Sequence, residues 1–210
     1  MVIMEQITLA NRKEFLSKVQ PKEGFNFKYI CNFDKEIKTI TEFLSRQLLH
    51  FHYHNENHFF FHTHKNIGNH GIMWVKNYDQ IELPYTTEII TDKLELVEIV
   101  NDLIEKLEII VGGKVVMSGL NILSSGKSMA PHTDQNDGKQ NFSPYYMVLR
   151  RFHIPIFTID ESFIRVGDQT LHMETGQCWE FNNNIEHEVW NNGTTDRLHI
   201  LFDVLPYKWL

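Results

Sequence analysis

The stretch GGKVVMSGLNIL, residues 112–123, separates a helical pattern of apolar residues from a series of short apolar runs. Two glycines close an amphipathic pattern, and the residues after them form the first of several short apolar runs separated by turn residues. The further runs are 145–157, 163–166, 170–173, 177–181, 187–190 and 197–204. Together with 114–123 they make seven short strands, which predict a mainly β sandwich or barrel.

Two amphipathic helices are predicted before residue 112, over residues 34–50 and 91–110. Apolar residues recur there at helical spacing, so one face of each helix should pack against the sheet. The first face carries Ile37, Ile40, Phe43, Leu44 and Leu48, and the second carries Leu96, Val100, Leu103, Leu107 and Ile110. Gly112 and Gly113 follow where the cap of the second helix is expected.

Two turns suggest how neighbouring strands pair. Gly167-Asp168 joins two apolar runs directly, and Asn192-Gly193 lies between the runs that begin at His187 and Arg197. Both pairs are typical of tight β turns, so each is predicted to close a hairpin.

The length of 210 residues predicts one domain over the whole chain, with 1–113 as supporting helices and outer strands and 114–206 as the β core. A net charge of −7, without a run of Lys or Arg, argues against a nucleic-acid partner. The first ten residues do not make a signal-peptide core, and no apolar run reaches the roughly 20 residues of a membrane span. A cytoplasmic protein without membrane contact is expected, with Cys31 and Cys178 as reduced thiols.

The tetrapeptide PHTD, residues 131–134, places an imidazole and a carboxylate two positions apart. On an extended segment both side chains leave from the same face, so His132 and Asp134 could bind one metal ion. His187, at the start of a predicted strand, is the best third ligand. Two histidines and one carboxylate favour non-haem Fe(II) with coordination positions left open. His-x-Asp alone is a common chance pattern, so its surroundings must support the hypothesis.

Arginine placement supplies that context. Arg197 lies ten residues after His187 across the predicted hairpin, so its guanidinium could reach the metal pocket. One arginine near a metal suits a dicarboxylate that binds the metal end-on. Arg151 and His153 share a strand face by alternation, while Arg150 and Phe152 share the other. Arg151 could equally be a surface strand residue, and the residues alone leave both alternatives open.

These segments together resemble the aspartyl/asparaginyl β-hydroxylase family. The stretches that carry the resemblance are LNILSSG (120–126), PHTD (131–134), LRRFH (149–153), GQCWEF (176–181), HEVW (187–190) and RLHILFD (197–203). Each is weak alone, whereas their order and spacing over 114–206 are fairly specific.

The resemblance implies a double-stranded β-helix, or jelly-roll, with Fe(II), 2-oxoglutarate and O2 at its open end. It implies that His132 and His187 are metal ligands, that Arg197 and Arg151 hold the carboxylates of 2-oxoglutarate, and that His153 lines that pocket. Asn121 stands where the family has a serine that contacts the cosubstrate. The animal enzyme has glycine at the carboxylate position, so Asp134 is similar to the bacterial proline-hydroxylase-like branch.

The implied reaction inserts an oxygen atom into an unactivated C–H bond of an amino acid, a small amino-acid derivative or a peptide side chain. Succinate and CO2 are released. Two alternatives remain open at this point: a protein-directed hydroxylase, and a non-catalytic jelly-roll sensor that binds metal or 2-oxoglutarate. No helical-repeat extension for gripping a protein is present, and a plain sensor needs no arginine clamp.

Seven of the twelve histidines fall between His50 and His70. Such a tract suggests a metal site, but no acidic or cysteine partner recurs at ligand spacing. The alternation of His52 with His54 and of His62 with His64 favours a strand pair near the mouth of the barrel instead.

Overall fold

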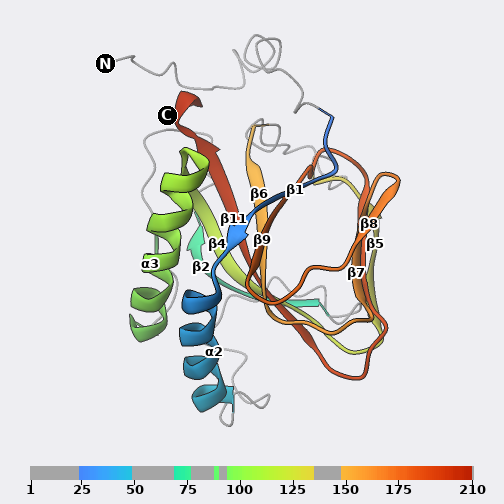
Figure 1. The fold of residues 1–210 in the computed structure, drawn as a ribbon, viewed down its shortest axis with the longest axis horizontal. Coiled ribbons are helices and arrows are strands. Elements are labelled where there is room, and N and C mark those ends of the chain that lie inside the picture. Colours follow the sequence, from blue (N-terminus) through green and yellow to red (C-terminus); the bar gives the residue numbers. More distant parts are fainter. Residues whose placement is uncertain (1–23, 49–68, 77–87, 90–93, 135–147, 210) are drawn as a thin grey trace.

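The architecture is taken from a computed structural model, which describes residues 24–48, 69–76, 88–89, 94–134 and 148–209. Two helices and eleven strands follow one another there (Figure 1). In chain order the elements are β1 Phe27–Asn32, α2 Asp34–Leu48, β2 Asn69–Lys76, β3 Glu88–Ile89, α3 Leu94–Val111, β4 Gly113–Leu123, β5 Lys127–His132, β6 Arg150–Phe157, β7 Ser162–Val166, β8 Gln169–Leu171, β9 Gln177–Phe181, β10 His187–Asn191, β11 Arg197–Pro206 and the short 3-10 helix η3 Tyr207–Trp209.

The strands form two antiparallel sheets that face each other. The larger sheet has the order β1-β9-β6-β11-β4-β2-β3, and the smaller has the order β5-β10-β7-β8. Helices α2 and α3 cover the outer face of the larger sheet, and the smaller sheet lies on its other side (Figure 1). This is the predicted jelly-roll with supporting helices in the N-terminal half.

The main core lies between the helices and the larger sheet. The buried residues of this core include Ile37, Ile40, Phe43 and Leu44 of α2, Val100, Leu103 and Leu107 of α3, and the side chains at alternate positions of β6 and β11. The α3 pattern fails at its end, because Ile110 is 51% exposed although it was expected on the apolar face. Gly112 ends α3 as predicted: its φ is +68°, and its N–H donates to the Glu108 carbonyl at 3.0 Å.

Alternation along β11 separates the two sides of the larger sheet. Leu198, Ile200, Phe202 and Val204 belong to the core beneath the helices. Arg197, His199, Leu201 and Asp203 therefore face the space between the two sheets. A second apolar cluster lies in that space and includes Leu123, Ile164, Val166, Met173, Phe181 and Val189. The space between the sheets therefore has an apolar part, formed by this cluster, and a polar part, formed by Arg197, His199 and Asp203 of β11.

Seven predicted strands are present with shifted ends. The run 145–157 becomes β6 only at Arg150, since its pairing with β11 begins there, opposite Val204; residues 145–147 lie outside the described part. The run 170–173 becomes β8, Gln169–Leu171, because its pairing with β7 stops at Leu171. Strands β1, β2 and β3 lie in the part of the chain where outer strands were expected without bounds, whereas β5 was not predicted. β5 has an edge-strand composition that includes Pro131 and is a strand because β10 pairs with it.

The two predicted hairpins have different outcomes. Gly167-Asp168 joins β7 to β8, with Val166 opposite Gln169 and Gly167 at φ +57°, so this hairpin is confirmed. The hairpin predicted at Asn192-Gly193 is wrong. β10 already lies between β5 and β7, and β11 lies between β6 and β4, so the connection crosses from one sheet to the other.

Two cysteines distant in sequence are cross-strand neighbours. Cys31 on β1 is the register partner of Cys178 on β9, and both are free thiols. A hydrogen bond between the two thiols lowers the pKa of Cys31, while the same contact and burial raise the pKa of Cys178. The expectation of reduced thiols agrees with this arrangement.

Within the described residues, no helix has the length and apolar character that crossing a membrane requires. Of the histidine-rich tract, residues 50–68 lie outside the described part of the chain. His70 belongs to β2, which pairs with β4 in the larger sheet.

Candidate active site

The three predicted metal ligands come together at one end of the smaller sheet. His132 ends β5 and His187 begins β10, and these two residues are register partners in the antiparallel pair. Directly opposite positions bring side chains close, and the two imidazole centroids lie 4.4 Å apart. Asp134 follows two residues after β5, where its N–H donates to the Asn183 carbonyl at 3.3 Å. Strand pairing and one loop contact therefore place all three side chains.

The donor atoms of this triad can surround one ion. Asp134 Oδ1 lies 3.9 Å from His132 Nε2 and 3.6 Å from His187 Nε2. One ligand atom from each of the three residues lies within 4.8 Å of the others. Two imidazoles and a carboxylate on one side of an ion are the donor set of non-haem Fe(II) sites. The residues present therefore fit the metal that the sequence predicted.

Backbone carbonyls orient both histidines. The Nδ1 of His132 lies 2.8 Å from the Ala130 carbonyl, and the Nδ1 of His187 lies 2.9 Å from the Ile185 carbonyl. A carbonyl can only accept, so Nδ1 carries the proton and Nε2 keeps its lone pair toward the triad. Burial is the main cause that lowers the pKa of His187, which keeps this ring neutral and ready to ligate.

Arg151 joins the triad to a buried carboxylate on β11. Its Nε and Nη2 donate to the two oxygens of Asp203 at 2.7 Å each, and its Nη1 donates to Asp134 Oδ2 at 2.7 Å. Asp203 is wholly buried and faces Arg151 across the β6–β11 pair. Arg151 is therefore not a free surface residue. It lies beside the metal site and contacts one of the proposed ligands.

Arg197 occupies the other end of the same interior. It is 2% exposed, and its Nη2 donates to Asn121 Oδ1 at 3.0 Å, while its Nε has no partner. Within the described residues, no carboxylate lies within ion-pair distance of it. Burial lowers the pKa of Arg197 to about 10, so the group is still a cation at neutral pH. The fold thus holds a buried positive charge whose neighbour is a neutral amide.

Two buried histidines lie between Arg197 and the triad. His153 Nδ1 is 3.4 Å from His199 Nδ1, and neither Nε2 has a partner. Burial and then the charge of Arg197 hold the pKa of both rings well below the usual range. Arg151 and His187 also lower the pKa of His153. The pair is neutral and lines the interior.

The structure thus brings all seven predicted site residues into one interior, although one step of the reasoning was wrong. Arg197 reaches it from β11, through pairing with β4 and β6 rather than with the His187 strand. His199 and Asp203 were missed. Both lie an even number of residues after Arg197, so the alternation argument applied to Arg151 and His153 would have placed them on the interior face.

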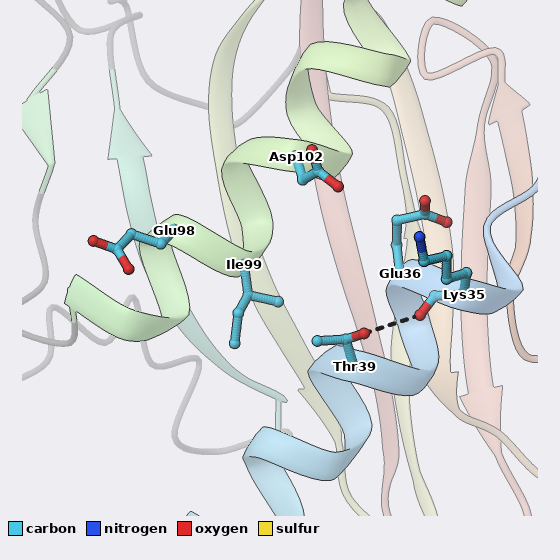
Figure 2. A pocket seen from close by; sticks show the side chains of 6 residues that line it. All are labelled: Lys35, Glu36, Thr39, Glu98, Ile99 and Asp102. Atoms are coloured by element: carbon cyan, nitrogen blue, oxygen red, sulfur yellow. Dashed lines mark hydrogen bonds between the residues drawn. The ribbon is translucent and has the colours of Figure 1, made fainter.

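A separate hollow lies between α2 and α3, on the helix side of the larger sheet (Figure 2). Its lining includes Glu36, Glu98 and Asp102, and Thr39 donates to the Lys35 carbonyl there at 3.1 Å. Lys106 bonds Glu36 at 2.6 Å and Asp102 at 3.1 Å, which compensates two of these charges. The hollow has no contact with the triad.

Solved structures share this fold at low sequence identity. An oxidoreductase of the 2OG-Fe(II) oxygenase family from Burkholderia pseudomallei has a TM-score of 0.55 at 9% identity, covering 97% of this chain and 92% of its own. A Pseudomonas putida prolyl-4-hydroxylase has a TM-score of 0.55 at 11% identity, covering 91% and 98%. The viral collagen prolyl hydroxylase of Paramecium Bursaria Chlorella virus-1 has a TM-score of 0.52 at 9% identity, covering 88% and 97%. No curated protein sequence matches the chain.

A jelly-roll with a His–Asp–His cluster and arginines in its interior defines the class of Fe(II)- and 2-oxoglutarate-dependent oxygenases. The sequence model of the aspartyl/asparaginyl β-hydroxylase family matches residues 36–206, and the chain belongs to that family. It is a dioxygenase that uses Fe(II), 2-oxoglutarate and O2. The match begins well before residue 114, so α2 and α3 are part of the family pattern as well.

Proposed function

We propose that this dioxygenase hydroxylates an unactivated carbon of an amino acid, a small amino-acid derivative or a peptide side chain. In this proposal His132, Asp134 and His187 hold Fe(II), and 2-oxoglutarate binds between the metal and Arg197. Bound iron supplies the chemistry that couples oxidation of 2-oxoglutarate to succinate with oxidation of the substrate. The chain's own residues hold the ligands, orient the cosubstrate and exclude water.

The buried cation of Arg197 is the observation that carries the proposal. An isolated charge removed from water costs several kcal/mol unless an opposite charge and hydrogen bonds compensate it. Within the described residues Arg197 has the amide of Asn121 and no ion-pair partner. A carboxylate bound there would pair with the guanidinium in a charge-assisted hydrogen bond. The distal carboxylate of 2-oxoglutarate has that chemistry, and its other end would reach toward the triad.

The other predicted cosubstrate residues fit an order along the pocket. Arg151 lies at the metal end, where it contacts Asp134. His153 lies between that end and Arg197, and one of the paired rings of His153 and His199 must present an Nε2–H. The reason is that one Nδ1 donates to the other, which makes the accepting ring the Nε2-protonated tautomer. That N–H is a further donor for a carboxylate, and Asn121 supports Arg197 from β4.

Substitution of Arg197 tests the cosubstrate site. Arg197→Ala should weaken 2-oxoglutarate binding by about 30-fold or more, because a buried charge pair is worth on the order of 2–5 kcal/mol. The dissociation constant is measured by calorimetry without O2, with Mn(II) in place of iron. Arg165→Ala is the matched control, since Arg165 on β7 pairs with Glu188 at the surface. Equal 2-oxoglutarate affinity in Arg197→Ala and Arg165→Ala would remove Arg197 from the site.

The substrate class is tested by turnover. Succinate release is compared across free amino acids, their small derivatives, short peptides and intact proteins, with Asp134→Ala as the inactive reference. Release stimulated by an amino acid, a derivative or a short peptide supports the proposal. Stimulation by intact proteins alone would overturn it in favour of a protein-directed hydroxylase. The absence of nucleic acid among the partners stays a prediction, and an oligonucleotide arm of the same assay tests it.

A further inference from the structure

The carboxylate of Asp203 has no part in the proposed reaction, yet it makes a two-bond contact with Arg151 in the interior. It is wholly buried on β11. Both of its oxygens accept from Arg151, at 2.7 Å from Nε and 2.7 Å from Nη2. Such a planar two-bond contact fixes the orientation of the guanidinium as well as its position.

A further hydrogen bond connects the oriented guanidinium of Arg151 to Asp134. Nη1 donates to Asp134 Oδ2 at 2.7 Å. The other oxygen, Oδ1, is the one that lies near the Nε2 atoms of His132 and His187. The two oxygens of Asp134 therefore have different surroundings, one facing the guanidinium and the other facing the histidine nitrogens.

We propose that Asp203 is a positioning residue for the metal, which acts through Arg151 to hold Asp134 as a one-oxygen ligand. This inference rests on the proposed metal site. Asp203 holds Arg151 by a two-bond contact, so Arg151 gives Asp134 one hydrogen bond instead of two. Asp134 then keeps Oδ1 for the metal, and the positions that a two-oxygen carboxylate would occupy stay open for cosubstrate and O2.

Charge balance gives this arrangement a measurable consequence. Asp203 and Arg151 together are neutral, which leaves the negative charge of Asp134 for the metal. In Asp203→Asn the guanidinium loses its two-bond carboxylate partner and keeps its hydrogen bond to Asp134. It then competes with the metal for Asp134. Loss of an outer partner of a metal ligand lowers metal affinity by about 10- to 100-fold, and we expect a loss in that range.

The neighbouring residue on β6 provides a matched control. Arg150 donates to the two oxygens of Glu180 at 2.9 and 2.7 Å, and Glu180 is 3% exposed. This pair has the same chemistry as Arg151 with Asp203, but it lies on the helix side of the sheet, where Arg150 also donates to the Val111 carbonyl. Glu180→Gln should therefore lower stability in the same way without changing metal affinity.

The experiment titrates metal-free protein with Co(II), reading the visible absorption of the bound ion and the heat of binding. Asp203→Asn should bind Co(II) about 10- to 100-fold more weakly than the parent, while Glu180→Gln should bind within about threefold of it. A double variant, Asp203→Asn with Arg151→Gln, removes the cation that competes with the metal for Asp134 and should bind more tightly than Asp203→Asn alone. A purely structural role for Asp203 predicts no such recovery.

The outcomes separate this inference from the proposed function. Asp134→Ala should lose Co(II) binding, and unchanged affinity there would overturn the metal site itself. Loss in Asp134→Ala together with parental affinity in Asp203→Asn would overturn the positioning role alone. If Asp203→Asn does not fold, Arg151→Lys keeps the charge without the planar two-bond contact. Parental Co(II) affinity in that variant would overturn the positioning role, and a loss of about tenfold would support it.

Discussion

Two backbone carbonyls decide which nitrogen of each proposed ligand histidine faces Asp134. The Ala130 carbonyl holds the Nδ1 proton of His132, and the Ile185 carbonyl holds that of His187. Each carbonyl lies two residues before its histidine, so the local backbone determines the tautomer. The same chemistry is absent from His153 and His199, whose Nδ1 atoms face one another. These two rings are therefore suited to line a pocket.

The neutral state of His153 and His199 gives a pH dependence to folding. Both pKa values are lowered in the folded protein, first by burial and then by Arg197. Below the ordinary value of about 6.5 the unfolded chain binds protons that the folded chain does not. The stability from these rings is therefore fully present above that pH, and it is lost as the pH falls toward the folded-state values. Each ring should therefore lower the free energy of unfolding as the pH falls through about 6.5.

The measurement is urea unfolding of the metal-free protein on both sides of this pH. The glutamine in His199→Gln cannot titrate, so this variant should lose less unfolding free energy than the parent between about pH 7.5 and 5.5. His172→Gln is the control, because His172 is only half-buried and its ring contacts Phe163 on the smaller sheet. A parental pH dependence in His199→Gln would show that this ring is not held neutral.

Among the secondary-structure elements, the glycine that precedes β9 occupies a position where the backbone turns and a side chain would clash. Gly176 precedes β9 at φ +83°, and a Cβ there would lie 2.5 Å from Asp34 Oδ1. Its carbonyl accepts from the Phe33 N–H at 2.9 Å, and its N–H donates to the Pro155 carbonyl at 3.0 Å. This residue thus ties β9 to the start of α2 and to β6.

Gly176→Ala should lower the free energy of unfolding by about 2–4 kcal/mol, because it combines a left-handed backbone with a steric clash. Gly112→Ala, at φ +68° with nothing within 4 Å of the added carbon, isolates the backbone cost and should lose about 1 kcal/mol. Gly24→Ala has neither feature and should be nearly neutral. Urea unfolding of the three variants checks this order, and an equal loss in Gly176→Ala and Gly112→Ala would refute the clash.

The larger sheet separates two kinds of interior across the whole molecule. The helix side holds the main apolar core, with Leu103, Leu107, Phe152, Ile200 and Phe202 fully buried. The other side holds the triad, Arg151, Arg197 and the buried histidines. Residues that stabilise the fold and residues that carry the chemistry therefore lie on opposite faces of the same strands.

Leu107→Ala should accordingly lower the free energy of unfolding by about 2–5 kcal/mol, the range for a leucine removed from a packed core. Co(II) affinity should stay within about twofold of the parent, because the cavity lies beyond the sheet from the ligands. Ile109→Ala on the same helix is the control, since Ile109 is 79% exposed and should contribute little to stability. A large loss of Co(II) affinity in folded Leu107→Ala would show that the two faces are coupled.

Features that depend on local pattern and residue type could be predicted from the amino-acid sequence. Helical spacing gave α2 and most of α3, and period-two alternation correctly assigned Arg151 and His153 to one face of β6. The residue types at 132, 134 and 187 indicated the metal, and the ordered motifs indicated the family. These features are readable because each depends on neighbours within a few positions along the chain.

Strand partners and charge pairs, in contrast, become visible only in the folded chain. The Asn192-Gly193 turn looked like a hairpin, yet β10 and β11 belong to different sheets because each already has two other neighbours. Arg151 meets Asp203 from 52 positions away, and His153 meets His199 from 46. No local pattern encodes these pairings, since they depend on the register of β6 against β11. The two arginines inferred from sequence therefore have different surroundings. Carboxylates hold Arg151 beside the His–Asp–His triad, whereas Arg197 is buried without an ion-pair partner among the described residues.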